Sequence, residues 1–317
     1  MRRNPEVSRD AFSFDPQDPR DAESRSPDAG REASSASTAG TPSSDSRESD
    51  TEGMRDVSRH REHKPEATDS PQAYYLRDRT YFVRDSEFET LAEIGTFRVV
   101  AAGDLARFGY RGDTGRMERE VGRLQHQRLL SEKTITTGKQ KTARVFTLTK
   151  TGKRLVQTSG RLPDTQAVYY GLVKPREAKH DAELYRLYQS EIARIARAGG
   201  RPLHVVLDFE LKRNLNRDLA TLAPESDVRE ARERIAEEHG LSIVNGRIQV
   251  PDLRIEYETA DMDRKHVDLE LATRNYRPQS LAEKAKAGFS LYAPREDASR
   301  LRRILDQREI TAEILSL

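Results

Sequence analysis

The stretch 246–292 constrains the fold more than any other part of the chain. Two strand patterns lie on either side of a polar turn, and a helix pattern predicted over 279–292 follows. Side chains alternate between the two faces of a strand, so polar residues at every second position share a face. In the later strand these residues are His266, Asp268 and Glu270. Acids gathered on one face of a short sheet can bind a metal, carry out acid–base chemistry or simply face solvent.

The two strands are expected to pair antiparallel around a turn centred on Asp261. This register places the aspartate of Pro251-Asp252 near Glu270, and Arg254 near Asp268. A solvated reading stays open, in which Asp268 and Glu270 form the outer face of an edge hairpin and pair with Arg254 across the strands.

Composition separates a polar N-terminal region from the rest of the chain. Charged residues make up 34% of the 317 residues and the mean hydropathy is −0.85. Residues 1–75 are rich in Ser, Asp, Arg, Pro and Gly and show no apolar periodicity. Such a segment buries too little apolar surface to offset its ordering entropy. A disordered tail is therefore predicted over 1–75.

The totals also narrow the class of protein. The formal net charge of +2 does not by itself indicate a nucleic-acid binder, and the absence of cysteine excludes disulfides, thiolate catalysis and cysteine zinc sites. No apolar run approaches the roughly 20 residues of a membrane span. The sequence therefore favours a cytoplasmic location without a membrane partner.

Residues 76–160 show three helix patterns followed by a basic hairpin. The helices are expected to begin near Asp85, Asp104 and Asp113 or Thr114. Two strand-like runs, 130–137 and 142–149, flank the turn Gly138-Lys139-Gln140-Lys141, and a short last helix follows. The third helix has an apolar stripe at i, i+4 and i+7, formed by Met117, Val121 and Leu124.

This order resembles a winged helix, and the run Leu130 to Leu155, with its LTKTGKRL, is similar to bacterial winged-helix regulators. A third helix of this kind can enter the major groove while the hairpin turn contacts phosphates. A domain that binds only protein is the alternative, and Glu118 and Glu120 weaken the purely electrostatic argument. The candidate DNA-binding residues are Arg116, Arg119, Arg123, Gln127, Lys139 and Lys141.

A linker is expected over 161–178, and a second domain over 179–295. Its predicted elements are a helix from His180 or Asp181 to Arg197, a strand over 203–207 continued by Asp208-Phe209-Glu210, and a helix after Ser226 or Asp227. Two short strands are joined by Asn245-Gly246, a strong hairpin signal. C-terminal helices are expected within 296–317.

The second domain resembles the PD-(D/E)XK nuclease fold. The resemblance implies that Asp252 and Glu270 hold Mg²⁺ or Mn²⁺, and that Glu191 or Glu183 supplies a further acid from the first helix. The family's lysine is absent, since Ala272 stands at its position. Either Asp268 is the acid and Glu270 takes the lysine position, or Lys284 or Lys286 replaces the lysine from the following helix. The candidate catalytic residues are Asp252, Asp268, Glu270 and Lys284.

Together, the two parts resemble the replication-relaxation family of plasmid and mobile-element proteins over roughly 85–295. The predicted fold class is thus α+β or α/β, with a winged-helix domain before a restriction-endonuclease-like domain. The resemblance implies a protein that binds double-stranded DNA in replication or relaxation, with a degenerate nuclease-like domain. Two alternatives are a magnesium-dependent endonuclease and an adaptor for replication or conjugation proteins. Whether the chain is an enzyme stays open.

Overall fold

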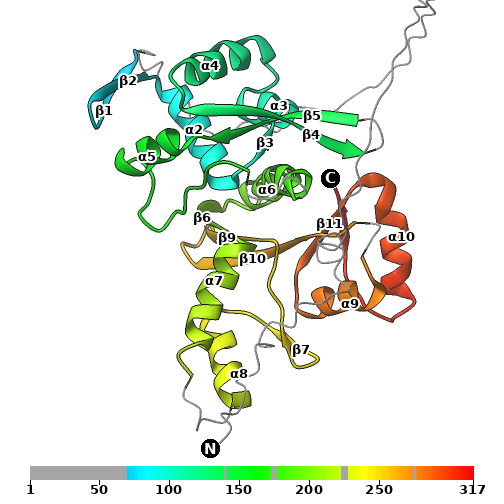
Figure 1. The fold of residues 1–317 in the computed structure, drawn as a ribbon. Coiled ribbons are helices and arrows are strands. Elements are labelled where there is room, and N and C mark those ends of the chain that lie inside the picture. Colours follow the sequence, from blue (N-terminus) through cyan, green and yellow to red (C-terminus); the bar gives the residue numbers. More distant parts are fainter. Residues whose placement is uncertain (1–69, 139–140, 173–176, 223–227, 274–275) are drawn as a thin grey trace, which may run out of the picture.

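The computed structural model describes residues 70–138, 141–172, 177–222, 228–273 and 276–317, which form a mixed α/β fold (Figure 1). The predicted tail over 1–69 and Lys139 lie outside these residues. Residues 72–75 belong to strand β1, so the tail prediction is wrong for them. No helix in the described ranges is long and apolar enough to cross a membrane.

The first part of the fold confirms the three predicted helices and the hairpin. It adds an N-terminal β-hairpin, β1 with β2, that was not predicted. Asp113 caps α4 by accepting a hydrogen bond from the Arg116 N–H, and the stripe of Met117, Val121 and Leu124 is buried. The elements are β1 (Gln72–Leu76), β2 (Arg79–Val83), α2 (Asp85–Phe97), β3 (Val100–Ala101), α3 (Ala102–Asp104), the π turn η1 (Leu105–Gly109), α4 (Thr114–His126), β4 (Leu130–Gly138), β5 (Lys141–Leu148) and α5 (Lys150–Thr158).

The second part is built on a five-stranded sheet in the order β12-β11-β10-β9-β6. Strands β6, β9 and β10 pair antiparallel, and β11 and β12 continue the sheet in parallel. The expected pairing of Arg254 with Asp268 is confirmed, as is the Asn245-Gly246 hairpin. The elements are α6 (Ala178–Arg197), β6 (Arg201–Leu207), α7 (Asp208–Leu219), α8 (Val228–Glu238), β7 (Ile243–Val244), β8 (Arg247–Ile248), β9 (Leu253–Glu258), β10 (Arg264–Leu271), α9 (Pro278–Lys286), β11 (Ser290–Ala293), α10 (Arg295–Asp306) and β12 (Ile314–Ser316).

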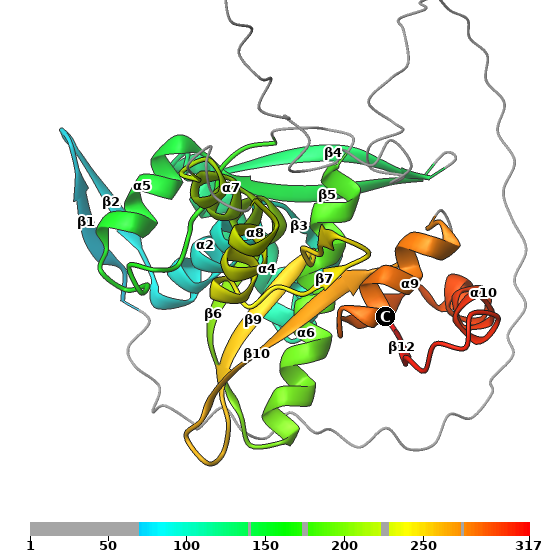
Figure 2. The ribbon, with the colours of Figure 1, turned by 90° about the horizontal axis from the view of Figure 1, so that it is seen from below.

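Helix α6 lies between the five-stranded sheet and a three-stranded sheet of the first part, in the order β3-β5-β4. It contacts β3 and β4 on one side and β6, β9 and β10 on the other. Figures 1 and 2 both show it against β9 and β10. One buried apolar cluster includes residues of α6 and extends to both sides of this helix. It reaches Leu91 of α2 and Phe146 of β5 on one side, and Leu207 and Leu269 of the larger sheet on the other. Tyr185 of this helix is fully buried.

Three predicted elements are wrong. Residues 208–210 do not extend β6 but begin α7, because Leu211 and Leu215 lie one turn apart and both enter an apolar cluster with Val206. The helix expected over 279–292 ends at Lys286, since Gly288 has a φ of 86° and the chain then pairs beside β10 as β11.

The third wrong element lies at the C-terminus. Only α10 is helical in the expected 296–317 region, and the apolar residues after Ile310 include strand β12 rather than a second helix. Ile314 is buried and pairs with Leu291 at the edge of the sheet. Backbone pairing along that edge outweighs the helical periodicity of so short a segment.

Candidate nucleic-acid interface and buried acidic cluster

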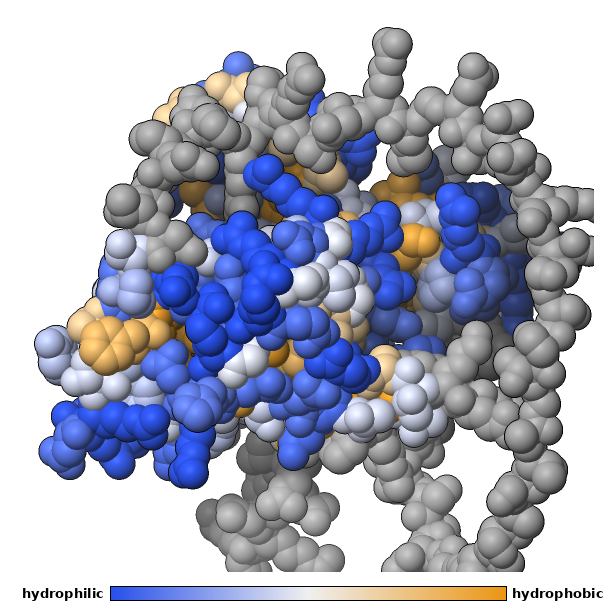
Figure 3. All heavy atoms as spheres, turned by 90° about the horizontal axis from the view of Figure 1, so that it is seen from above, coloured by the Kyte–Doolittle hydropathy of each residue, from blue (hydrophilic) through white to orange (hydrophobic). Residues whose placement is uncertain are grey.

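Helix α4 presents a polar face to solvent opposite its buried stripe. Gly115, Arg119, Gly122 and His126 are exposed and lie three or four residues apart, so they share this face. A Cβ built at Gly122 would meet nothing within 4 Å. Figure 3 shows hydrophilic side chains over most of the upper surface, where Figure 1 places α4.

Three of the predicted DNA-binding side chains are held within the protein. The Nε of Arg123 donates to Glu87 Oε1 at 2.5 Å, and Glu87 is buried. Gln127 Nε2 donates to the Phe82 carbonyl at 2.8 Å, and Gln127 Oε1 accepts a hydrogen bond from the Phe82 N–H at 2.9 Å. Arg116 donates to Glu120 at 2.8 Å. The contacts of Arg123 and Gln127 join α4 to α2 and β2, and the Arg116–Glu120 pair lies within α4.

Among the predicted DNA-binding residues of α4, Arg119 remains available. It is exposed, and no ion pair joins it to an acid within the described part of the chain. Lys141 begins β5, beside the tip of the hairpin. Lys139 lies outside the described residues.

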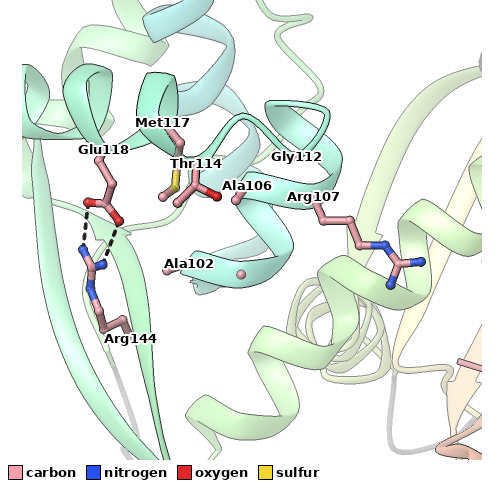
Figure 4. A pocket seen from close by; sticks show the side chains of 9 residues that line it. Ala102, Ala106, Arg107, Gly112, Thr114, Met117, Glu118 and Arg144 are labelled. Carbon is pink, nitrogen blue, oxygen red and sulfur yellow. Dashed lines mark hydrogen bonds and ion pairs between the residues drawn. The ribbon is translucent and has the colours of Figure 1, made fainter. Parts of the chain in front are cut away.

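The acids of α4 are both neutralised by arginines. Glu120 is buried beside Arg116. Glu118 receives two hydrogen bonds from Arg144 of β5, at 2.8 and 3.2 Å, as Figure 4 shows. The same guanidinium donates to Glu132 of β4 and holds the pKa of that exposed carboxyl below its usual range. Arg144 therefore joins the hairpin to α4. The sequence did not suggest this role, because the role depends on the register of β4 and β5.

The sheet of the second part brings Asp252, Glu270 and Lys284 together. Lys284 Nζ lies 3.3 Å from Glu270 Oε2 and donates to the Val250 carbonyl at 2.7 Å. The backbone N–H of Asp252 donates to Glu270 Oε2 at 3.3 Å. Of the sequence-based options for the missing lysine, the structure places Lys284 from α9 at the acids. The side chains of Asp252 and Glu270 are both 0% exposed.

Two further groups complete this acidic cluster. His180 Nε2, at the start of α6, lies 3.5 Å from Asp252 Oδ1. The Tyr276 hydroxyl donates to Glu270 Oε1, a contact that the sequence did not suggest. The Leu271 N–H donates to Asp252 Oδ2 at 2.9 Å, so protein donors surround the carboxylates.

Asp268 and Glu191 take part in separate ion pairs. Asp268 receives two hydrogen bonds from Arg254, at 2.6 and 2.8 Å, and both side chains are buried. The solvated reading of this strand face is therefore wrong for Asp268 and Glu270. Glu191 is 0% exposed, pairs with Arg194 at 2.7 Å and accepts a hydrogen bond from Tyr292 of β11.

The acidic cluster does not fit a hydrated metal in this arrangement. Mg²⁺ is usually held by one or two carboxylates and keeps several waters. Asp252 and Glu270 supply that number of carboxylates, but their complete burial leaves no place for the waters. Among the described residues, no group of three or more His, Asp or Glu side chains could hold a metal ion.

Comparisons with known proteins leave the family open. No family model matches the chain, and no curated protein matches it. A solved structure of PadR from Bacillus subtilis in complex with operator DNA is 15% identical, covers 50% of this chain and 95% of its own, and gives a TM-score of 0.21. A likeness this weak carries no argument about the function of this chain.

Proposed function

We propose that this chain binds duplex DNA through α4 and the β4–β5 hairpin, arranged as a winged helix. One observation carries the proposal: α4 presents Arg119 outward while both of its acids are tied to arginines. Gly122, where a Cβ would meet nothing within 4 Å, leaves room beside Arg119 for a phosphate backbone to approach the helix closely. Phosphate contacts of this kind dominate affinity for duplex DNA.

The biological setting that the family resemblance implies is plasmid or mobile-element replication or relaxation, in the cytoplasm. Double-stranded DNA is the proposed partner, and replication or conjugation proteins would join it in that setting. The acidic cluster and the Arg254–Asp268 pair then serve the architecture of the second part, as expected for a degenerate nuclease-like sheet.

The test is an Arg119→Ala variant titrated against a random-sequence duplex by fluorescence anisotropy at several salt concentrations. Loss of one phosphate contact is expected to lower the slope of log K against log salt by about 1. Arg300→Ala, which removes an exposed arginine from α10, is the matched control. Arg123→Ala is unsuitable, because it would uncover the buried Glu87. An unchanged slope and affinity in Arg119→Ala would remove α4 from the interface.

A second candidate function is metal-dependent DNA cleavage. The observation in its favour is the position of Lys284, which places an ammonium group beside Glu270 although Ala272 stands at the motif's own position. Burial of both carboxylates opposes it, and we infer binding without cleavage.

A nicking assay distinguishes binding alone from cleavage. Supercoiled plasmid is incubated with the full chain and Mg²⁺ or Mn²⁺. The proposal expects no conversion to nicked circles. Nicking by the wild-type chain that disappears in both Asp252→Asn and Lys284→Met would establish cleavage instead. Nicking that survives both substitutions would point to a contaminating nuclease.

A further inference from the structure

A basic hollow lies between the turn of the β1–β2 hairpin and the beginning of α5. Its volume is about 390 Å³. Four cations line it, with Asp78 as the one acid among the lining residues. The cations are Arg77, Arg79, Lys150 and Arg154.

These cations are not neutralised by the described part of the protein. None of the four forms an ion pair with a described residue, whereas Arg161 is paired with Asp85 at 2.9 Å. Arg79 lies over the ring of Tyr81, which holds its guanidinium at the wall of the hollow. Four positive charges gathered beside a single acid repel one another, so the hollow is suited to an anion.

The backbone of Arg77 supports a role beyond the turn itself. Arg77 and Asp78 form the two-residue turn between the paired Leu76 and Arg79, and Arg77 has a φ of 55°. Glycine is the usual residue at such a position, because a side chain there strains the backbone. An arginine at this point keeps a cation at the hollow at the expense of local stability.

Both walls of the hollow are attached to the end of α4. Gln127, at the C-terminal cap of α4, pairs with Phe82 of β2. Thr149, just before Lys150, donates its hydroxyl hydrogen to the Arg128 carbonyl at 2.7 Å. The hollow therefore lies beside the C-terminal end of the helix that carries Arg119.

We infer that this basic hollow binds a phosphate group. Its cations match the charge of phosphate, and arginine guanidinium groups match its oxygen geometry. The phosphate belongs either to the backbone of a duplex lying along α4, which rests on the proposed function, or to a free phosphate compound. The two sources share one chemistry and are separated by experiment.

The experiment uses the full chain in two independent arms. Isothermal titration with inorganic pyrophosphate tests the hollow without DNA, and anisotropy with a random-sequence duplex at several salt concentrations tests the backbone contact. The variants are Arg77→Gly and the double change Arg77→Gly with Arg154→Gln. The control is Arg300→Gln with Arg303→Gln, which removes two exposed charges from α10.

We expect the double variant either to bind pyrophosphate at least tenfold more weakly or to change its binding of duplex. In the second case the slope of log K against log salt should fall by about 0.9, which corresponds to one lost phosphate contact. Arg77→Gly should weaken binding in the same arm while its melting temperature stays equal to or above that of the wild type, which separates ligand loss from unfolding. If the variants differ from the control only in pyrophosphate binding, the ligand is a free phosphate compound. If they differ only in duplex binding, the ligand is the phosphate backbone of the duplex.

Variants that match the control in both arms overturn the inference about the hollow. If the wild-type chain binds duplex in that case, the proposed function stands without the hollow. A wild-type chain that binds no duplex removes the proposed function, and the pyrophosphate arm then decides the hollow by itself.

Discussion

Asp181 shows at the residue scale how burial changes the behaviour of a charged group. It lies in the first turn of α6, and its side chain is 16% exposed. Burial raises the pKa of Asp181 to about 6, against the partly compensating charges of His180 and of Arg98, whose Nη1 lies 3.5 Å away. Asp208 and Glu177 add to the increase. The carboxyl therefore resists ionisation in the folded chain.

The stability of the fold is expected to depend on pH through Asp181. Its folded pKa of about 6 exceeds the ordinary 3.8, so its contribution is fully present below pH 3.8 and is lost as the pH rises through 6. A shift of this size corresponds to about 2–3 kcal/mol. Urea unfolding at pH 4.5 and 7 should therefore show a smaller loss of stability for Asp181→Asn than for the wild type. The exposed Asp306→Asn is the control, and equal losses in wild type and Asp181→Asn would contradict the argument.

At the element scale, the run LTKTGKRL joins α5 to the end of α4. The Thr149 side chain accepts a hydrogen bond from the Gly152 N–H at 3.0 Å and so caps α5. Gly152 then packs directly on the Leu129 backbone, where a Cβ would lie 2.2 Å from the carbonyl oxygen. The glycine is needed for this close approach, and its backbone φ is not positive.

Two glycine-to-alanine substitutions should have opposite effects on stability. Gly152→Ala forces α5 away from Leu129 and is expected to destabilise the fold by about 1–3 kcal/mol. Gly122→Ala, in open space on α4, should stabilise it by about 0.5–1 kcal/mol, because alanine loses less backbone entropy in a helix. Chemical denaturation measures both. Equal effects of the two changes would show that the contact with Leu129 is not decisive.

At the scale of the whole molecule, α6 makes the two sheets parts of one core. Tyr185 is buried and its hydroxyl donates to Glu93 of α2 at 2.7 Å, while other residues of α6 contact β9 and β10. The apolar cluster is continuous across both parts. Two parts that share a buried helix should lose their structure together.

A single unfolding unit is the expected outcome of this packing. Leu187→Ala, at a fully buried position of α6, should cost about 2–5 kcal/mol. Hydrogen exchange should show that this substitution lowers the opening free energy of peptides from α2 and from β10 by the same amount, relative to the wild type. A reduction confined to one of the two segments, or two separate urea transitions, would show that the parts fold independently.

Local patterns in the sequence determined the elements whose pairing is short-range. The stripe of α4, the Asn245-Gly246 turn and the alternation along β9 and β10 correctly predicted a helix, a hairpin and the Arg254–Asp268 register. Lys284 was also a candidate from its place after Glu270. These features depend on side-chain period and turn chemistry, which neighbouring residues carry by themselves.

The tertiary structure alone decided what the polar side chains of α4 do. Arg123 and Gln127 belong to the same helix pattern as Arg119, yet distant partners, Glu87 and Phe82, hold them. Strands β11 and β12 exist because an open sheet edge offers backbone hydrogen bonds to short apolar segments. Partners separated by tens of residues set these outcomes, and local periodicity contains no information about such partners.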